Sequence, residues 1–118
     1  MIPIDQTLFK QDGVSGNCMQ AAVASLMEMP LEQVPHFAHS GSPEVCWDLF
    51  EDWFNEQGYT VRFSGIVDKN CNYLAAGPTV RGTQHMVVMH GDKVIHDPHP
   101  SRAGLLDIAH TFVLVPKC

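Results

Sequence analysis

Basic side chains are scarce in this chain. Lysine and arginine together number 7 against 13 aspartates and glutamates, which gives a formal net charge of -6 with histidine neutral. No run of basic residues occurs anywhere in the sequence. Nucleic acids and anionic membranes are bound chiefly through clustered lysine and arginine. We therefore expect neither nucleic acid nor a membrane among the partners, and the sequence leaves the oligomeric state open.

Long apolar stretches are missing too. No segment approaches the ~20 consecutive apolar residues that cross a bilayer as a helix. The stretch Met1–Asp5 has neither a charged leader nor a long apolar run, so we expect no signal peptide. None of the four cysteines lies in a Cys-x-x-Cys pair, which disfavours a zinc ribbon. Without an export signal, we expect reduced thiols and a cytoplasmic location.

The composition that is present describes one folded domain. The chain has 118 residues, of which 45% are hydrophobic and 17% charged, and this is the balance of a globular protein. That length suffices for one hydrophobic core, and no internal repeat or low-complexity tract divides the chain. We expect a single domain over residues 1–118.

Helical patterns come first along the chain. Residues 18–27 are apolar nearly all round, which indicates a buried helix that ends before Pro30. Residues 31–35 predict one short helical turn. A second helix is expected from Ser42-Pro43 to Gly58, and its aromatic residues recur at helical spacing. We expect that aromatic stripe to pack in the core.

Strand patterns follow the helices. Branched and aromatic residues predict strands, and Gly91-Asp92 predicts a hairpin turn. The expected strands cover 59–63, 73–79, 85–90, 93–96 and 111–115, with a short edge strand within 1–8. Helices followed by antiparallel strands are typical of an α+β domain. The predicted fold is an N-terminal buried helix and a second helix packed on an antiparallel β-sheet.

The start of the first helix suggests a nucleophile. Gly16 permits a sharp turn, Asn17 is a good N-cap, and Gln20 completes a capping-box pattern. Cys18 then occupies the first helical position, where the free amides of the helix favour the thiolate. A buried, inert cysteine is the alternative, because free cysteine is often a small core residue.

His85 and Asp97 are the expected partners of Cys18. A thiol nucleophile needs a base, and the base needs an orienting group. His85 opens a strongly apolar strand that would hold its ring rigidly, and Asp97 ends the returning strand. A regular two-residue hairpin would point Asp97 away from His85. A three-residue loop or a β-bulge would instead bring the two to one face.

These residues resemble the papain-like cysteine peptidase superfamily. Its bacteriocin-leader peptidase domains, found in ABC exporters, pair a cysteine at a helix start with a histidine heading a strand and a later Asp-Pro. Cys18, His85 and Asp97-Pro98 are similar in order and spacing, and further motifs look like a group of small bacterial and phage proteins. The resemblance implies a papain-like fold. It also implies an oxyanion hole with an upstream glutamine, for which Gln6 fits the small-protein group better than Gln11.

The activity that the resemblance implies is that of a thiol hydrolase. Cys18, His85 and Asp97 would form a triad that works through a thioester. The substrate would be a peptide or protein, cleaved at a peptide, isopeptide or side-chain amide bond, and no cofactor or metal ion is expected. Hydrolysis, deamidation and transamidation use the same three residues, so the choice among them stays open.

Two other functions stay open. The first is a papain-fold binding or inhibitor protein without chemistry, such as a phage-encoded inhibitor, whose acidic helix over 44–56 meets a basic partner. The second is metal binding by the histidines of the predicted hairpin and its exit, which are His85, His90, His96 and His99. An unreactive Cys18 would favour the first function, and bound metal in the purified protein would favour the second.

Overall fold

The computed structural model describes residues 1–8, 16–40, 43–63, 71–80 and 82–116, and it contains helices followed by strands. The α-helices are α1 (Cys18–Met27) and α2 (Pro43–Glu56), and two 3-10 turns, η1 (Leu31–Gln33) and η2 (Phe37–Ser40), lie between them. The strands are β1 (Tyr59–Phe63), β2 (Asn72–Pro78), β3 (Gln84–His90), β4 (Lys93–His96) and β5 (His110–Pro116). The α+β class is confirmed. The proposed cap Ser42 lies outside the described residues.

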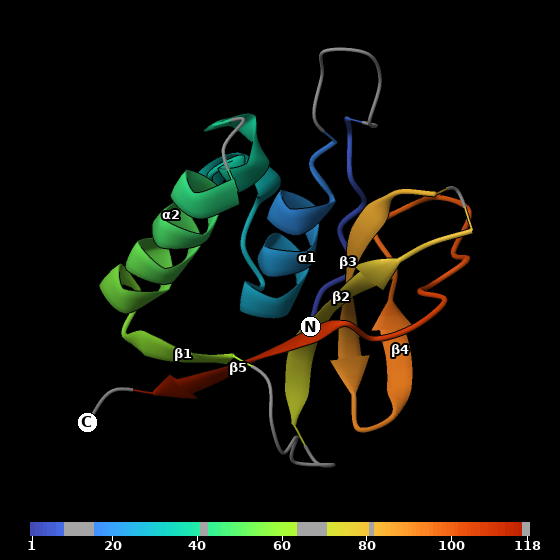
Figure 1. Cartoon of the computed structure of the whole chain (residues 1–118). Helices are drawn as coiled ribbons and strands as arrows, with labels where there is room; N and C mark the ends of the chain where they lie inside the picture. The colour runs from blue at the N-terminus through green and yellow to red at the C-terminus, as the bar shows by residue number, and fades with distance from the viewer. Residues whose placement is uncertain (9–15, 41–42, 64–70, 81, 117–118) are drawn as a thin grey trace.

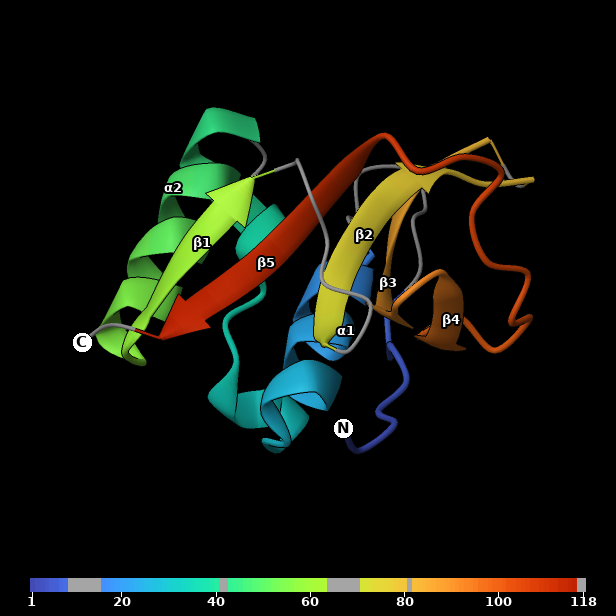
Figure 2. The same cartoon turned by 90° about the horizontal axis from the view of Figure 1, so that it is seen from below.

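The described strands form one antiparallel sheet in the order β1-β5-β2-β3-β4. The last strand of the chain, β5, therefore lies between β1 and β2. Both α-helices pack on the sheet, α1 against β2 and β3 and α2 against β1 (Figure 1). Seen from below, the strands turn strongly from β1 to β4, and α2 lies beside β1 (Figure 2). This twist is the usual right-handed one, which lets one sheet wrap around a small core.

The core lies mainly between the helices and the sheet. The middle of α1 is fully buried, as its apolar sequence predicts, and Phe50 and Phe54 of α2 are fully buried beside it. Phe50 packs edge-on against Phe37 and Phe112 with ring centroids 5.5 and 5.6 Å apart. The expectation that the aromatic stripe is core packing is confirmed for these rings.

The edge strand expected within residues 1–8 is wrong. The segment runs beside α1 and is held by side chains rather than by a strand ladder. The Ile4 amide donates to Oγ of Ser25 at 2.9 Å, and the Ile4 carbonyl accepts from Nε2 of His96 at 2.8 Å. Ser25 is fully buried in α1, so its hydroxyl needs such partners. Its hydrogen bonds explain why the segment follows the helix.

Among the described residues, no helix has the length and the apolar character needed to cross a bilayer.

Candidate active site

A β-bulge decides the geometry of the site. Gly91-Asp92 forms the two-residue turn, with His90 paired to Lys93 and Gly91 at φ 61°. Met89 then pairs with Val94, but Val88 pairs with His96, so Ile95 is an extra residue in β4. An extra residue reverses the alternation of every side chain after it. Of the alternatives open from the sequence, the bulge is the one found, and it turns Asp97 to the face of His85.

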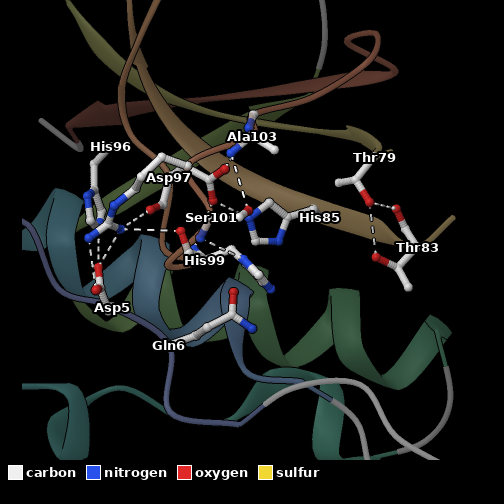
Figure 3. A network of polar contacts seen from close by, with 12 residues as sticks. Asp5, Gln6, Thr79, Thr83, His85, His96, Asp97, His99, Ser101 and Ala103 are labelled. Atoms are coloured by element: carbon white, nitrogen blue, oxygen red, sulfur yellow. Dashed lines mark hydrogen bonds and ion pairs between the residues drawn. The ribbon is translucent and has the colours of Figure 1, made fainter. Parts of the chain in front are cut away.

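His85 and Asp97 are in direct contact. Nε2 of His85 lies 2.5 Å from Oδ1 of Asp97, and the two residues are 5% and 3% exposed (Figure 3). The same carboxylate accepts the amide of His99 on Oδ1 at 2.9 Å and the amide of Gly104 on Oδ2 at 2.7 Å. Three donors therefore satisfy a carboxylate that is almost out of water, as a buried charge requires.

Asp97 is ionised at neutral pH. Burial pushes the pKa of Asp97 upward, but the hydrogen bonds from His85, His99 and Gly104 outweigh burial and hold it below the ordinary value of 3.8. An ionised carboxylate can only accept, so Nε2 of His85 carries the proton in this contact. In the neutral ring, this tautomer puts the basic lone pair on Nδ1.

Arg102 fixes the loop that follows Asp97. Its guanidinium donates to the Asp97 carbonyl and forms a two-pronged pair with Asp5, at 2.6 and 2.9 Å. The hydrogen bond from Arg102 holds the pKa of Asp5 below its usual value. The backbone amide of Gln6 also donates a hydrogen bond to the Pro98 carbonyl at 3.0 Å. The N-terminal segment and the loop after β4 thus hold each other at the site, as Figure 3 shows.

Cys18 is the first residue of α1, as expected, and lies beside β3. Its thiol is close to the backbone amide of Met86, the residue after His85. The negative charge of Asp97 also acts on the thiol and raises its pKa. Burial raises the pKa of the Cys18 thiol, although the amides of Met86, Met19 and Cys18 itself oppose that effect. The expectation that the helix start favours the thiolate is therefore wrong for the resting state, because desolvation outweighs the amides.

The structure brings two of the three predicted triad residues into contact. Between the described residues there is no hydrogen bond from the Cys18 thiol to the His85 ring. The interactions of the Cys18 thiol with this site are instead the contact with the Met86 amide and the electrostatic effect of the Asp97 carboxylate. The arrangement can do acyl chemistry only if this last contact closes, and such contacts often tighten on substrate binding.

The predicted capping box at the start of α1 is wrong. Asn17 makes no side-chain cap bond; its Oδ1 accepts the amides of Thr7 and Leu8 at 2.9 and 2.8 Å. Nε2 of Gln20 donates to the carbonyls of Leu31 and Val34 at 3.0 and 2.8 Å. Both side chains fasten neighbouring segments to the helix start instead. They position Cys18 from outside the helix.

Gln6 lies at the site, and one of its side-chain N–H donors is engaged by Leu8. The side chain is 8% exposed, and its Nε2 donates to the Leu8 carbonyl at 2.9 Å. Its Oε1 is buried and has no hydrogen-bond partner among the described residues. Since the Leu8 carbonyl can only accept, the amide nitrogen must face Leu8. One of the two N–H donors of the Gln6 side chain is thus used by Leu8. Gln11 lies outside the described residues.

The histidines do not gather as metal ligands in the part of the chain that the structure describes. That part contains no group of three or more His, Cys, Asp or Glu side chains that could hold a metal ion. His90 contacts Oδ1 of Asn72 at 2.8 Å, and His96 contacts the Ile4 carbonyl. Only His99 lies near His85, with the rings edge to face at 6.2 Å. The contacts of His90 and His96 are those of structural residues.

The backbone donors at the site could not be predicted from the sequence. The His99 and Gly104 amides hold Asp97, but any residue except proline carries an amide, so no residue pattern marks them. Comparisons of the chain with protein-family models, with curated proteins and with solved structures found no match.

Proposed function

We propose that the chain is a papain-like thiol hydrolase in which Cys18 attacks a carbonyl carbon and His85, oriented by Asp97, moves the protons. The observation that carries the proposal is the buried His85–Asp97 pair, on the strand whose Met86 amide lies against the Cys18 thiol. A buried carboxylate that fixes a histidine tautomer next to a thiol is the arrangement that nucleophilic catalysis requires.

In the first step a carbon–sulfur bond forms and a carbon–nitrogen bond breaks. Because the pKa of Cys18 is raised, the resting nucleophile is the thiol, and His85 must take its proton as sulfur attacks. The imidazolium, stabilised by Asp97, then gives that proton to the leaving nitrogen. The products are a free amine, or ammonia, and a thioester on Cys18.

In the second step the thioester is cleared. Water attacks the carbonyl carbon, His85 takes the water proton, and the carbon–sulfur bond breaks. The sulfur regains a proton from His85, so the enzyme returns to its first state. Amide groups at the start of α1 lie around the reacting atoms and are the natural donors to the oxyanion. No cofactor or metal ion enters these steps.

The substrate class follows from the chemistry of the nucleophile. A thiol acting through a thioester suits a peptide, an isopeptide or a side-chain amide, and the proposed partner is a peptide or protein. Cys18 and Cys46 are free thiols in the structure, which is compatible with the reducing cytoplasm that we propose as its location.

The proposal is tested with p-nitrophenyl acetate, a small acyl donor that needs no specificity pocket. Mass spectrometry should locate the acetyl group on Cys18. The rate of acetylation at neutral pH should fall by roughly 100-fold or more in His85→Ala. His90→Ala is the matched control, because His90 lies on the same strand and is exposed. Acetylation at other sites, or an equal rate without His85, would exclude the proposed mechanism.

A binding protein without chemistry is the second candidate, and two observations favour it. The pKa of Cys18 is raised, and Nε2 of Gln6 uses one of its two N–H donors on the Leu8 carbonyl. Both would suit a papain-like fold that has lost its activity. The acetylation experiment separates the two candidates, since an inactive protein acetylates no faster than a free thiol of the same pKa.

A further inference from the structure

Residues of α2, β1 and β5 form an open aromatic hollow, away from the His85–Asp97 contact. Its volume is about 180 Å³, and it is lined by Trp47, Phe63, His110 and Phe112. One water needs only roughly 15 Å³ of such a space, so the hollow admits a group of several non-hydrogen atoms. β2 separates β5 from the strand that carries His85, and Figure 2 shows α2 beside β1. The hollow is therefore a feature separate from the candidate active site.

The rings of the hollow meet nearly at right angles. Trp47 stacks on Phe112 with centroids 5.1 Å apart, and Phe112 is 2% exposed, so the floor of the hollow is rigid. The ring of Phe63 stands at 84° to that of Trp47 and at 85° to that of Phe112. His110 lies two residues before Phe112, on the same face of β5, with the ring centroids 6.4 Å apart. A small group in the hollow therefore contacts rings on more than one side.

The charges beside the hollow are negative. Glu44 and Glu51 lie one turn before and one turn after Trp47 on α2, on the same side of the helix. Arg62 precedes Phe63 in β1 but lies on the opposite face of the sheet, because successive residues of a strand alternate. The chain as a whole is acidic, with a net charge of -6. The electrostatic field at the hollow therefore favours a cation.

We propose that this aromatic hollow binds a quaternary ammonium group, as carried by a trimethylated lysine side chain or by a small molecule such as choline. The face of an aromatic ring attracts a cation, and the carboxylates of Glu44 and Glu51 add a longer-range attraction. Because ring surfaces dominate the lining, an ordinary ammonium would lose its hydrogen bonds to water there, whereas a quaternary ammonium has no N–H to satisfy. The proposal is independent of the hydrolase activity proposed for Cys18.

Titrations of the whole chain, followed by NMR, test the proposal. Choline is compared with 3,3-dimethylbutan-1-ol, a molecule of the same shape in which carbon replaces the charged nitrogen. We expect choline to shift the Trp47 indole resonance and to bind at least roughly 3-fold more tightly than the alcohol, which is the effect of a cation–π contact at a partly exposed site. The Trp53 indole, which packs against Phe37 with centroids 6.1 Å apart, is the internal control and should not shift.

A second pair of ligands distinguishes the two sources of the ammonium group. N-acetyl-trimethyllysine methylamide and N-acetyl-lysine methylamide are titrated in the same way, and only the trimethylated compound should shift the Trp47 indole at equal concentration. Tighter binding of trimethyllysine than of choline would identify a methylated protein as the source. Equal or weaker binding would identify a small molecule. Equal binding of the two lysine compounds would overturn the proposal.

Variants separate the rings from the charges. Phe63→Leu removes a ring but keeps an apolar side chain at a position that is 42% exposed, so choline should bind at least roughly 3-fold more weakly while the alcohol is unaffected. The double variant Glu44→Gln/Glu51→Gln should weaken choline binding at low salt, and the difference should vanish at about 1 M salt, where exposed charges are screened. Glu56→Gln is the matched control, because Glu56 is exposed at the far end of α2, and should bind choline like the wild type.

Two further results would overturn the proposal. Equal binding of choline and the alcohol would mean that the hollow acts through apolar contact alone, and no shift of the Trp47 indole at about 100 mM choline would mean that the hollow binds no quaternary ammonium. Cys18→Ala should bind choline like the wild type, because the hollow is separate from the candidate active site. A loss of binding in that variant would contradict this separation.

Discussion

At the scale of single residues, Asp97 is the group on which the site depends. It is 3% exposed, yet its carboxylate is charged and accepts from His85, His99 and Gly104. Removing one partner of a buried charge costs more than the net value of the contact, because the remaining groups lose their partner in a dry environment. Cys18 shows the opposite balance, since burial there raises the pKa of the thiol despite nearby amides.

Asp97→Asn should lower the free energy of unfolding by roughly 2–4 kcal/mol at neutral pH, because an amide cannot accept from both His85 and Gly104. The pKa of Asp97 is depressed in the folded state, so its contribution is fully present above the ordinary value of 3.8 and is lost as pH falls through the lower folded value. The difference between variant and wild type should therefore shrink below about pH 3.8, in urea unfolding measured at several pH values. A difference independent of pH would contradict an ionised Asp97.

Gln6→Leu separates two roles for a residue that sequence reasoning placed in the oxyanion hole. Nε2 of Gln6 already donates to Leu8, and turning the amide would set Oε1 against the Leu8 carbonyl. We expect the acetylation rate of Cys18 to fall by less than about 10-fold, whereas losing an oxyanion donor costs about 10²–10³. A loss of the larger size would show that the amide turns when substrate binds.

At the scale of secondary-structure elements, the bulge in β4 is the feature that assembles the site. Without the extra residue, the two-residue turn at Gly91-Asp92 would send Asp97 to the other face of the sheet. The Ile95 side chain is 39% exposed and packs little. The role of Ile95 is therefore to add one residue to β4, which shifts the register of the residues that follow it. The geometry of the His85–Asp97 pair is thus a consequence of register.

Deleting Ile95 should restore regular alternation and separate Asp97 from His85. We expect the rate of Cys18 acetylation to fall by roughly 100-fold or more, as when a base loses its orienting group. Ile95→Ala keeps the residue count and should keep the rate. The NMR signal of the His85 ring reports the same change independently of activity. A deletion variant with wild-type acetylation would mean that Asp97 is not the orienting group.

The start of α1 gives a matched pair of stability predictions. Asn17 is 2% exposed, and Asn17→Ala removes the acceptor of the Thr7 and Leu8 amides together with a buried side chain. We expect a loss of roughly 2–4 kcal/mol in urea unfolding. Asn72→Ala removes an exposed amide that contacts only the His90 ring among the described contacts, and should change stability by less than about 0.5 kcal/mol. Equal effects would show that Asn17 does not hold the N-terminal segment.

Most elements were predictable because their residues carry a local signal. The run of branched residues in β3 and the cap-like Gly58 after α2 placed those elements within one or two residues. The β-bulge was only one of the alternatives that the sequence allowed, because Ile95 fits a regular strand equally well. Residues 1–8 and Asn17 were predicted wrongly because their hydrogen bonds go to partners distant in the sequence, and no local pattern reports those.

At the scale of the whole molecule, three separate parts of the chain meet at one end of the sheet. The N-terminal segment supplies Gln6 and Asp5, the first helix supplies Cys18, and the β3–β4 hairpin with its following loop supplies His85, Asp97 and Arg102. Such a site forms only when the fold is complete, so chemical reactivity at Cys18 should report on the folded state as a whole.

The pH dependence of Cys18 acetylation by p-nitrophenyl acetate, compared between wild type and His85→Ala, tests the central claim most directly. The account predicts that the wild-type rate is already high at neutral pH, because His85 acts as base while the thiol itself ionises only at a raised pKa. In His85→Ala the acetylation rate should rise only at alkaline pH, where the Cys18 thiol ionises without a base. Superimposable profiles for the two proteins would contradict the account, and Cys18 would then be a buried structural thiol.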